Sequence, residues 1–254
     1  MKKIFTIVFL AILSLLIPSI ATAADFANEK LSYVITYKWG LIQKDAGDAV
    51  LSSRLNNGKY TFTLTAKTKP WADKFFPVRD TLTATVLKNG FVPQRYVKIA
   101  HEGDKFAKDV ITYTHSAGHV GGKCERYRDK NGSQSTAKNT LTATGPTFDM
   151  LSVFYFLRII DYNKLTKGSV TKLTIFSGSK AETLTIRGLG REKIKLRDKT
   201  QCEAYRISFT FTTGGKKKSS DDINCWISAD DRRIPLLLIG TLPVGQVKCY
   251  YTGK

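Results

Sequence analysis

The sequence is poor in the residues that carry catalysis. Its 254 residues include three histidines, all in the first half, and neither a Gly-x-Ser-x-Gly nor a Cys-x-x-Cys motif occurs. These gaps argue against a Ser-His-Asp hydrolase, a thiol redox enzyme and a cysteine-based zinc site. His115 and His119 have the i, i+4 spacing of helical metal ligands, but Gly118 lies between them, so a hairpin turn is expected. We predict a protein that is not an enzyme and that binds neither metal nor cofactor.

Long apolar runs are missing after residue 23. The one such run, Ile4–Ile20, follows Met1-Lys2-Lys3 and precedes Ala21-Thr22-Ala23. A basic start, an apolar stretch and a small-x-small end are typical of a secretory signal peptide. An uncleaved membrane anchor is the alternative, although the run is short for that role. We predict removal of residues 1–23 and an exported, soluble single domain over residues 24–254, with no transmembrane segment.

Acidic residues are outnumbered by basic ones. The chain has 40 Lys and Arg against 21 Asp and Glu, which gives a formal net charge of +19. In a cytoplasmic protein this balance would suggest nucleic acid. An exported protein meets other polyanions, namely anionic lipid headgroups, lipopolysaccharide and acidic glycans, so we expect one of these and no nucleic acid. A basic surface that merely keeps the protein soluble is the alternative.

Cysteine is scarce, but its count is even. The four cysteines are Cys124, Cys202, Cys225 and Cys249. An even number in an exported chain predicts disulfides. Cys225 and Cys249 share the inward parity of their expected strands, which favours one bridge between them and leaves Cys124 with Cys202. A simple meander would place a strand between Cys225 and Cys249, and this counts against the pairing.

Alternating apolar and polar residues fill most of the chain. After the hairpin signal Asn56-Asn57-Gly58, for example, Tyr60, Phe62, Leu64 and Ala66 alternate with threonines. Similar strands are expected in both halves, whereas a polar, threonine-rich connection is expected before residue 146. We predict a mainly β protein, with a curved antiparallel up-and-down sheet or a barrel-like sandwich.

One stretch breaks the alternation. Residues 147–160 follow Pro146, and Asp149 is placed to accept N–H groups of a first helical turn. At the helical period their apolar side chains cover nearly the whole circumference, which is typical of a buried helix. We therefore expect one central helix, buried in the hollow of the sheet.

Three parts of the chain form a familiar series. They are Leu31-Ser32-Tyr33 with Trp39-Gly40-Leu41-Ile42 and Ala46-Gly47-Asp48-Ala49, then Asp149–Arg158, then Trp226–Pro235 with Val244-Gly245. In content and order this series resembles the DUF3108 family of exported Gram-negative proteins. The resemblance implies a periplasmic β protein of the cell envelope. It carries over no catalytic residue, because the family has no assigned function, and the cysteines are not part of its pattern.

Five residues are candidate ligand contacts, two outside the expected helix and three on it: Trp39, Trp71, Ser152, Tyr155 and Arg158. The two tryptophans would form an apolar rim with Phe75-Phe76, unless they are core residues. Arg158 ends the helix, where it is either a cation that interacts with the helix dipole or an anion contact at a cavity mouth.

These observations favour a non-enzymatic envelope protein that binds or carries an anionic lipid or acidic glycan in an apolar cavity. A structural or assembly factor, which binds an envelope protein through exposed sheet edges, is the second hypothesis. A hydrolase of envelope polymers is the third, and it requires a polar cleft with converging carboxylates. The centre of the sheet discriminates between them: an empty apolar pocket, a filled core or a polar cleft.

Overall fold

The computed structural model describes residues 25–213, 217–218, 222–242 and 245–253, so the expected signal peptide lies outside the described residues. The described strands form a 16-stranded sheet. In chain order they are β1 (Lys30–Trp39), β2 (Ile42–Asn56), β3 (Lys59–Thr68), β4 (Val78–Leu87), β5 (Val92–Glu102), β6 (Lys105–Ser116), β7 (His119–Lys130), β8 (Ser133–Thr144), β9 (Thr147–Asp149), β10 (Val170–Ser177), β11 (Lys180–Lys195), β12 (Gln201–Thr213), β13 (Lys217–Lys218), β14 (Ile223–Ser228), β15 (Pro235–Thr241) and β16 (Gln246–Tyr251). Short helical turns are α2 (Pro70–Asp73), η1 (Asn89–Phe91) and α3 (Ser152–Phe156).

The sheet is largely an antiparallel meander. Strands β1 to β8 pair in sequence, and β16 pairs with β1, which gives the order 8-7-6-5-4-3-2-1-16-15-14-12-11-10-9. Only the short β9 pairs in parallel, with β10, among the described strands. The predicted mainly β, up-and-down architecture is therefore confirmed.

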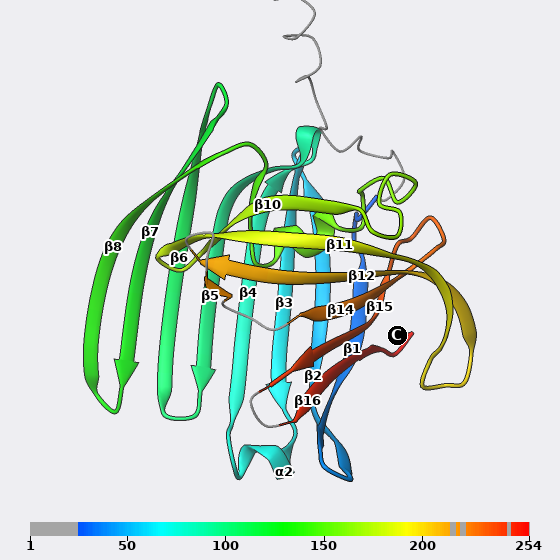
Figure 1. The fold of residues 1–254 in the computed structure, drawn as a ribbon. Helices are drawn as coiled ribbons and strands as arrows, with labels where there is room; N and C mark the ends of the chain where they lie inside the picture. The colour runs from blue at the N-terminus through cyan, green and yellow to red at the C-terminus, as the bar shows by residue number, and fades with distance from the viewer. Residues whose placement is uncertain (1–24, 214–216, 219–221, 243–244, 254) are drawn as a thin grey trace, which may run out of the picture.

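The sheet curls until its two ends almost meet. In Figure 1, β1 to β8 run upright in one layer, and β10, β11 and β12 cross in front of that layer at a steep angle. The layers touch closely where Gly122 of β7 faces Phe176 of β10, since a Cβ on Gly122 would lie 2.8 Å from the ring. Glycine is used at such close approaches because it has no side chain. The result is a nearly closed, barrel-like sheet.

The predicted central helix is wrong. Residues 147–149 form strand β9, and the helix that follows, α3, spans five residues. Asp149 Oδ1 accepts the backbone N–H groups of Leu151 and Ser152 at 2.9 and 2.7 Å, which starts a turn directly after the strand. Beyond α3 the chain continues in tighter i+3 turns, such as Arg158 N–H to Tyr155 O at 3.0 Å. Burial was predicted correctly, because this irregular segment is covered by both layers.

Two other elements differ from expectation. The expected polar connection before residue 146 is strand β8, at one end of the sheet. Its side chains are exposed on both faces over most of its length, so no apolar alternation marks it. In the second half, separate strands are expected at Glu182–Arg187 and Glu192–Leu196, but both belong to one strand, β11, with a register shift between Gly188 and Gly190.

Aromatic rings fill the space between the layers around α3. The Tyr155 ring stacks on Phe62 with centroids 3.6 Å apart, and Phe26 meets both edge-on. Phe91, Phe148 and Phe156 continue this cluster. The centre of the sheet at this point is a filled core.

The structure contains free thiols at all four cysteines. Cys225 on β14 lies opposite Leu238 of β15, and Leu238 lies opposite Cys249 of β16. The two cysteines are therefore two strand spacings apart, about 10 Å, which is too far for a disulfide. Cys124 is on β7, and Cys202 is near the start of β12, next to the β11–β12 turn. Figure 1 shows β7 and the β11–β12 turn on opposite sides of the molecule. The predicted disulfides are thus absent from this structure. Burial raises the pKa of the Cys249 thiol to about 12.

Candidate functional site

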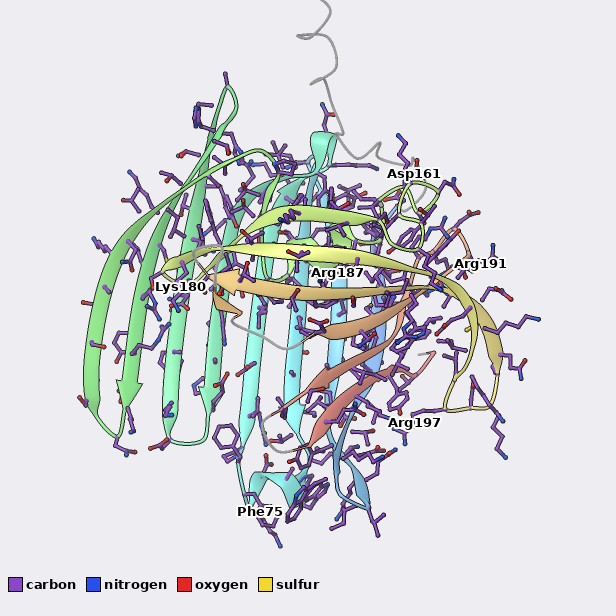
Figure 2. All side chains as sticks on the ribbon, in the orientation of Figure 1. Phe75, Asp161, Lys180, Arg187, Arg191 and Arg197 are labelled. Carbon is purple, nitrogen blue, oxygen red and sulfur yellow. The ribbon has the colours of Figure 1, made fainter. Side chains whose placement is uncertain are left out.

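Exposed apolar side chains gather at one end of the molecule. Of seven large hydrophobic residues that are exposed in the described part, five come from two neighbouring segments, the β1–β2 turn and the residues after α2. Figure 1 shows both segments at the same end, and Figure 2 places Phe75 there. We call these five residues the apolar tip: Trp39, Leu41, Ile42, Phe75 and Phe76.

The apolar tip is held by specific contacts beneath it. Trp71 Nε1–H donates a hydrogen bond to the Asp45 carbonyl at 2.8 Å, and Lys69 N–H donates to the Ala46 carbonyl at 2.8 Å. These two bonds join the α2 segment to β2. The Trp71 ring also meets Phe75 edge-on at 6.3 Å. The two segments therefore form one surface rather than two independent loops.

Exposure at the apolar tip is unusually complete. Trp39 is 59 %, Phe75 81 % and Leu41 104 % exposed. Hairpin turns normally carry polar or glycine residues, and Gly40, with φ of +56°, supplies the turn here. Leu41 and Ile42, the next two residues, bury little of their apolar surface in this position. Contiguous exposed apolar residues of this kind mark interaction sites.

Three acidic residues beneath the apolar tip, Asp45, Asp48 and Asp73, each have a basic partner. Asp45 accepts two bonds from Arg197 at 2.9 and 3.1 Å, Asp48 lies 3.3 Å from Lys69, and Asp73 lies 2.7 Å from Arg79. The Arg197 guanidinium holds the pKa of Asp45 below its usual range, and Arg79 lowers that of Asp73 to about 2. The carboxylates of Asp45 and Asp73 are therefore favoured in their ionised, paired form.

Unpaired lysines remain around the apolar tip. Lys38, Lys44 and Lys74 are exposed and have no acidic partner in the described residues. The Lys44 ammonium lies 4.4 Å from the centroid of the Trp71 ring, which is a cation–π distance. The site is therefore an apolar surface with unpaired basic side chains around it.

The five predicted contact residues do not converge. Trp39 belongs to the apolar tip and Trp71 supports it, whereas Ser152, Tyr155 and Arg158 are buried in the interior. Ser152 Oγ donates to Asp149 Oδ2 at 2.8 Å and so serves the turn before α3. The sequence analysis thus named three of the five residues of the apolar tip, Trp39, Phe75 and Phe76, and missed Leu41 and Ile42. The sequence feature that could have identified Leu41 and Ile42 is a pair of apolar residues directly after the turn glycine Gly40.

Arg158 is the most heavily engaged of the buried residues. Its guanidinium makes two bonds to Glu29 at 2.6 and 2.8 Å and two to the carbonyls of Arg232 and Arg233 at 2.8 and 2.9 Å. It also lies 4.7 Å from the ring centroid of Phe26. These bonds join the N-terminal segment, the central segment and the β14–β15 turn. This geometry supports a structural role, and a ligand contact at Arg158 stays a prediction.

The described residues form a barrel-like sheet with an exposed apolar surface at one end. They do not form a recognisable catalytic centre. A family model described as "Protein of unknown function (DUF3108)" matches residues 32–252, and the chain belongs to this family. The predicted membership is confirmed.

Among solved structures, the chain is similar to the beta-barrel-like protein of domain of unknown function DUF1849 from Brucella abortus. The TM-score is 0.59 at 12 % identity, over 91 % of this chain and 98 % of that chain. At this identity the likeness concerns the fold alone. No curated protein matches the chain.

Proposed function

We propose that this protein is a non-enzymatic protein of the periplasm that binds anionic lipid surfaces through its apolar tip. The observation that carries the proposal is the joint exposure of five large apolar side chains beside three unpaired lysines. The signal-like residues 1–23 support a location where such surfaces are accessible. No helix of the described part is long and apolar enough to cross a membrane, so peripheral binding fits the chain.

The chemistry of the apolar tip matches a bilayer interface. Trp side chains favour the headgroup level, and apolar side chains beside them gain by entering the acyl boundary. Each lysine near an anionic surface adds roughly 1 kcal/mol of attraction at physiological salt. A protein partner could bind the same apolar surface, but the unpaired lysines would contribute less to that binding. Lipid is therefore the better match.

Binding at the surface is favoured over carriage inside the sheet. Aromatic side chains fill the interior around Tyr155, where an enclosed lipid tail would otherwise lie. The apolar tip offers a binding surface without an internal cavity. The two other hypotheses, an assembly factor and an envelope-polymer hydrolase, stay predictions.

Vesicle co-sedimentation tests the proposal. We expect the protein to pellet with phosphatidylglycerol vesicles, and much less with phosphatidylcholine vesicles, at low salt. The double variant Leu41→Ser/Phe75→Ser removes two of the most exposed apolar side chains and is expected to stay in the supernatant. Added salt is expected to weaken binding, because the lysine contribution is screened.

Val170→Ser is the matched control. Val170 is 54 % exposed on β10, outside the apolar tip, so its replacement removes exposed apolar surface elsewhere. This variant is expected to pellet like the unaltered protein. Equal loss of binding in Val170→Ser and the double variant, or no preference for the anionic vesicles, would overturn the proposal.

A further inference from the structure

The inner face of the upright layer carries charge where core residues are expected. Lys98 of β5 lies directly opposite Asp109 of β6, and Asp109 lies opposite Arg126 of β7. These three positions share their strand face with buried core residues, such as Tyr96 on β5 and Ile111 on β6. A charged row on an inward face is costly unless the charges are paired or serve a ligand.

The neighbouring row leaves space beside these charges. Ala66, Asp80, Ala100 and Ala107 occupy facing positions on β3 to β6. Because three of the four are alanines, the layers do not close there, and a groove of about 560 Å³ remains. Its size is in the range of small-molecule sites.

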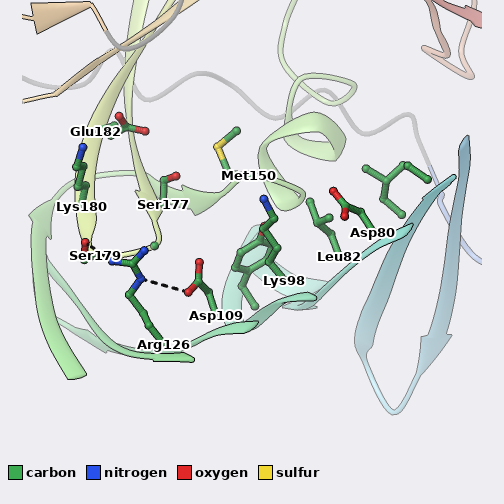
Figure 3. A pocket seen from close by; sticks show the side chains of 14 residues that line it. Asp80, Leu82, Lys98, Asp109, Arg126, Met150, Ser177, Ser179, Lys180 and Glu182 are labelled. Atoms are coloured by element: carbon green, nitrogen blue, oxygen red, sulfur yellow. Dashed lines mark hydrogen bonds and ion pairs between the residues drawn. The ribbon is translucent and has the colours of Figure 1, made fainter. Parts of the chain in front are cut away.

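The other layer covers the groove with a fixed turn. The β10–β11 turn, residues 177–180, lies across from the charged row, with Met150 beside it (Figure 3). Arg126 Nη1–H donates to Ser179 Oγ at 3.0 Å and so attaches this turn to β7. Arg126 and Arg128 both pair with Asp109, at 3.3 and 2.7 Å. The walls are therefore held in place by protein contacts.

Two polar groups of the groove lack partners in the part of the chain that the structure describes. Tyr96 is 2 % exposed and lines the groove, so its phenol ring is part of the groove wall. Asp80 Oδ1 is buried there without a hydrogen-bond partner among the described residues. Lys180, on the covering turn, has no acidic partner within the described chain. A buried carboxyl oxygen without a partner is destabilising unless something else satisfies it.

The electrostatics of these groups suit a ligand with hydroxyl groups and a negative charge. Burial raises the pKa of Asp80, and the nearby Glu102 carboxylate adds to this, so Asp80 is drawn toward its neutral form. The negative charge of Asp109 is balanced by its ion pairs with Arg126 and Arg128. Lys98 pairs with Glu102 at 3.5 Å, so Lys180 is the lysine of the lining that is available to an anion. Leu64, Leu82 and Met150 supply apolar surface.

We propose that this groove binds a short glycan that carries an anionic group. In this arrangement Tyr96 and Asp80 hydrogen-bond to sugar hydroxyls, Lys180 attracts the carboxylate or phosphate, and the leucines pack against the C–H face of a ring. A lipid tail fits this site poorly, because polar side chains line much of it. The site is separate from the apolar tip and does not depend on the lipid-binding proposal.

Isothermal titration calorimetry with three defined probes tests the proposal. Trigalacturonate supplies carboxylates, trehalose 6-phosphate supplies a phosphate, and maltotriose is neutral. We expect at least one anionic probe to bind and maltotriose to bind more weakly. Tyr96→Phe removes one hydroxyl and keeps the ring, so it is expected to raise the Kd about fivefold. Lys180→Gln is expected to raise it by a similar factor.

Lys138→Gln is the control, since Lys138 is an exposed lysine on β8, away from the groove. It is expected to bind like the unaltered protein. Backbone amide NMR shifts of Gly178 and Ser179 upon addition of the probe would report the location. Binding of neither anionic probe would overturn the proposal, and so would equal affinity in Tyr96→Phe, Lys180→Gln and Lys138→Gln. Leu41→Ser/Phe75→Ser, which tests the lipid proposal, is expected to leave this binding unchanged.

Discussion

At the scale of single residues, Arg158 shows how much of the fold depends on one buried ion pair. Its charge is satisfied by Glu29 and two backbone carbonyls, and its side chain is 1 % exposed. Removing one partner of such a pair leaves the other charge buried without compensation. The pair therefore stabilises contacts between three distant segments of the chain.

We predict that Arg158→Met lowers the free energy of unfolding by roughly 3 to 5 kcal/mol. Urea denaturation followed by circular dichroism measures it. The control is Lys164→Met, which removes an exposed pair with Asp161 at 3.9 Å. That change is expected to cost less than about 1 kcal/mol. Similar losses in both variants would contradict the structural role of Arg158.

Asp149 predicts a pH dependence of stability. Burial raises its pKa to about 6, although hydrogen bonds from Ser152 and Leu151 oppose this shift. In the unfolded chain its pKa is near 3.8. Between these values the folded state binds more protons than the unfolded state, so the free energy of unfolding falls as pH rises from about 4 to 6.

We expect this fall to amount to about 3 kcal/mol. Denaturation at pH 4, 5, 6 and 7 measures it, and the Asp149→Asn variant, which cannot ionise, should show a flatter profile. A profile of the unaltered protein that does not differ from that of Asp149→Asn would count against the raised pKa.

At the scale of elements, the close contact of β7 and β10 keeps the two layers together. Gly122 faces Phe176 so closely that a methyl group would overlap the ring. We predict that Gly122→Ala lowers the free energy of unfolding by about 1 to 3 kcal/mol, the usual cost of overpacking. The double variant Gly122→Ala/Phe176→Leu, with a smaller facing side chain, should recover part of the loss. Chemical denaturation measures the free energy of unfolding of both variants. If the double variant recovers none of the loss, the loss does not come from the contact with Phe176.

Most strands were predictable because one of their faces is buried and the other is exposed to solvent. Strand β3, with Tyr60 and Phe62 buried, is a clear case. Strand β8 was missed because it lies at the end of the sheet with most side chains in solvent, so the alternation is absent. The central segment was predicted as a helix because apolar residues all round it indicate burial and cannot indicate backbone shape. Asp149, which accepts N–H bonds directly after a strand, decided the shape instead.

The candidate sites were harder to predict than the strands. Trp39 was recognised as part of an apolar rim, because an aromatic residue beside a turn glycine is conspicuous. The groove was not recognised, since Lys98, Asp109 and Arg126 are far apart in the sequence and meet only through strand register. The available signal for these charges was that each lies on the inward-facing side of its strand, and bringing them together requires the register of three strands to be known.

At the scale of the whole molecule, the charge and the apolar surface have different distributions. Basic residues outnumber acidic ones in a chain with a net charge of +19, whereas exposed large apolar residues of the described part concentrate at the apolar tip. Long-range attraction to an anionic surface would therefore act on the whole protein, and insertion would act at one end. If the proposed lipid binding is correct, both anionic headgroups and an accessible acyl layer are expected to contribute to it.

Fluorescence of Trp39 in the presence of vesicles tests this account most directly. Trp39 is the exposed tryptophan of the apolar tip, and its emission should shift to shorter wavelength upon addition of phosphatidylglycerol vesicles. Lipids brominated on their acyl chains should quench it, and the Trp39→Phe variant should lose most of both responses. Emission that is unchanged by vesicles, or equally changed in Trp39→Phe, would contradict the insertion of the apolar tip.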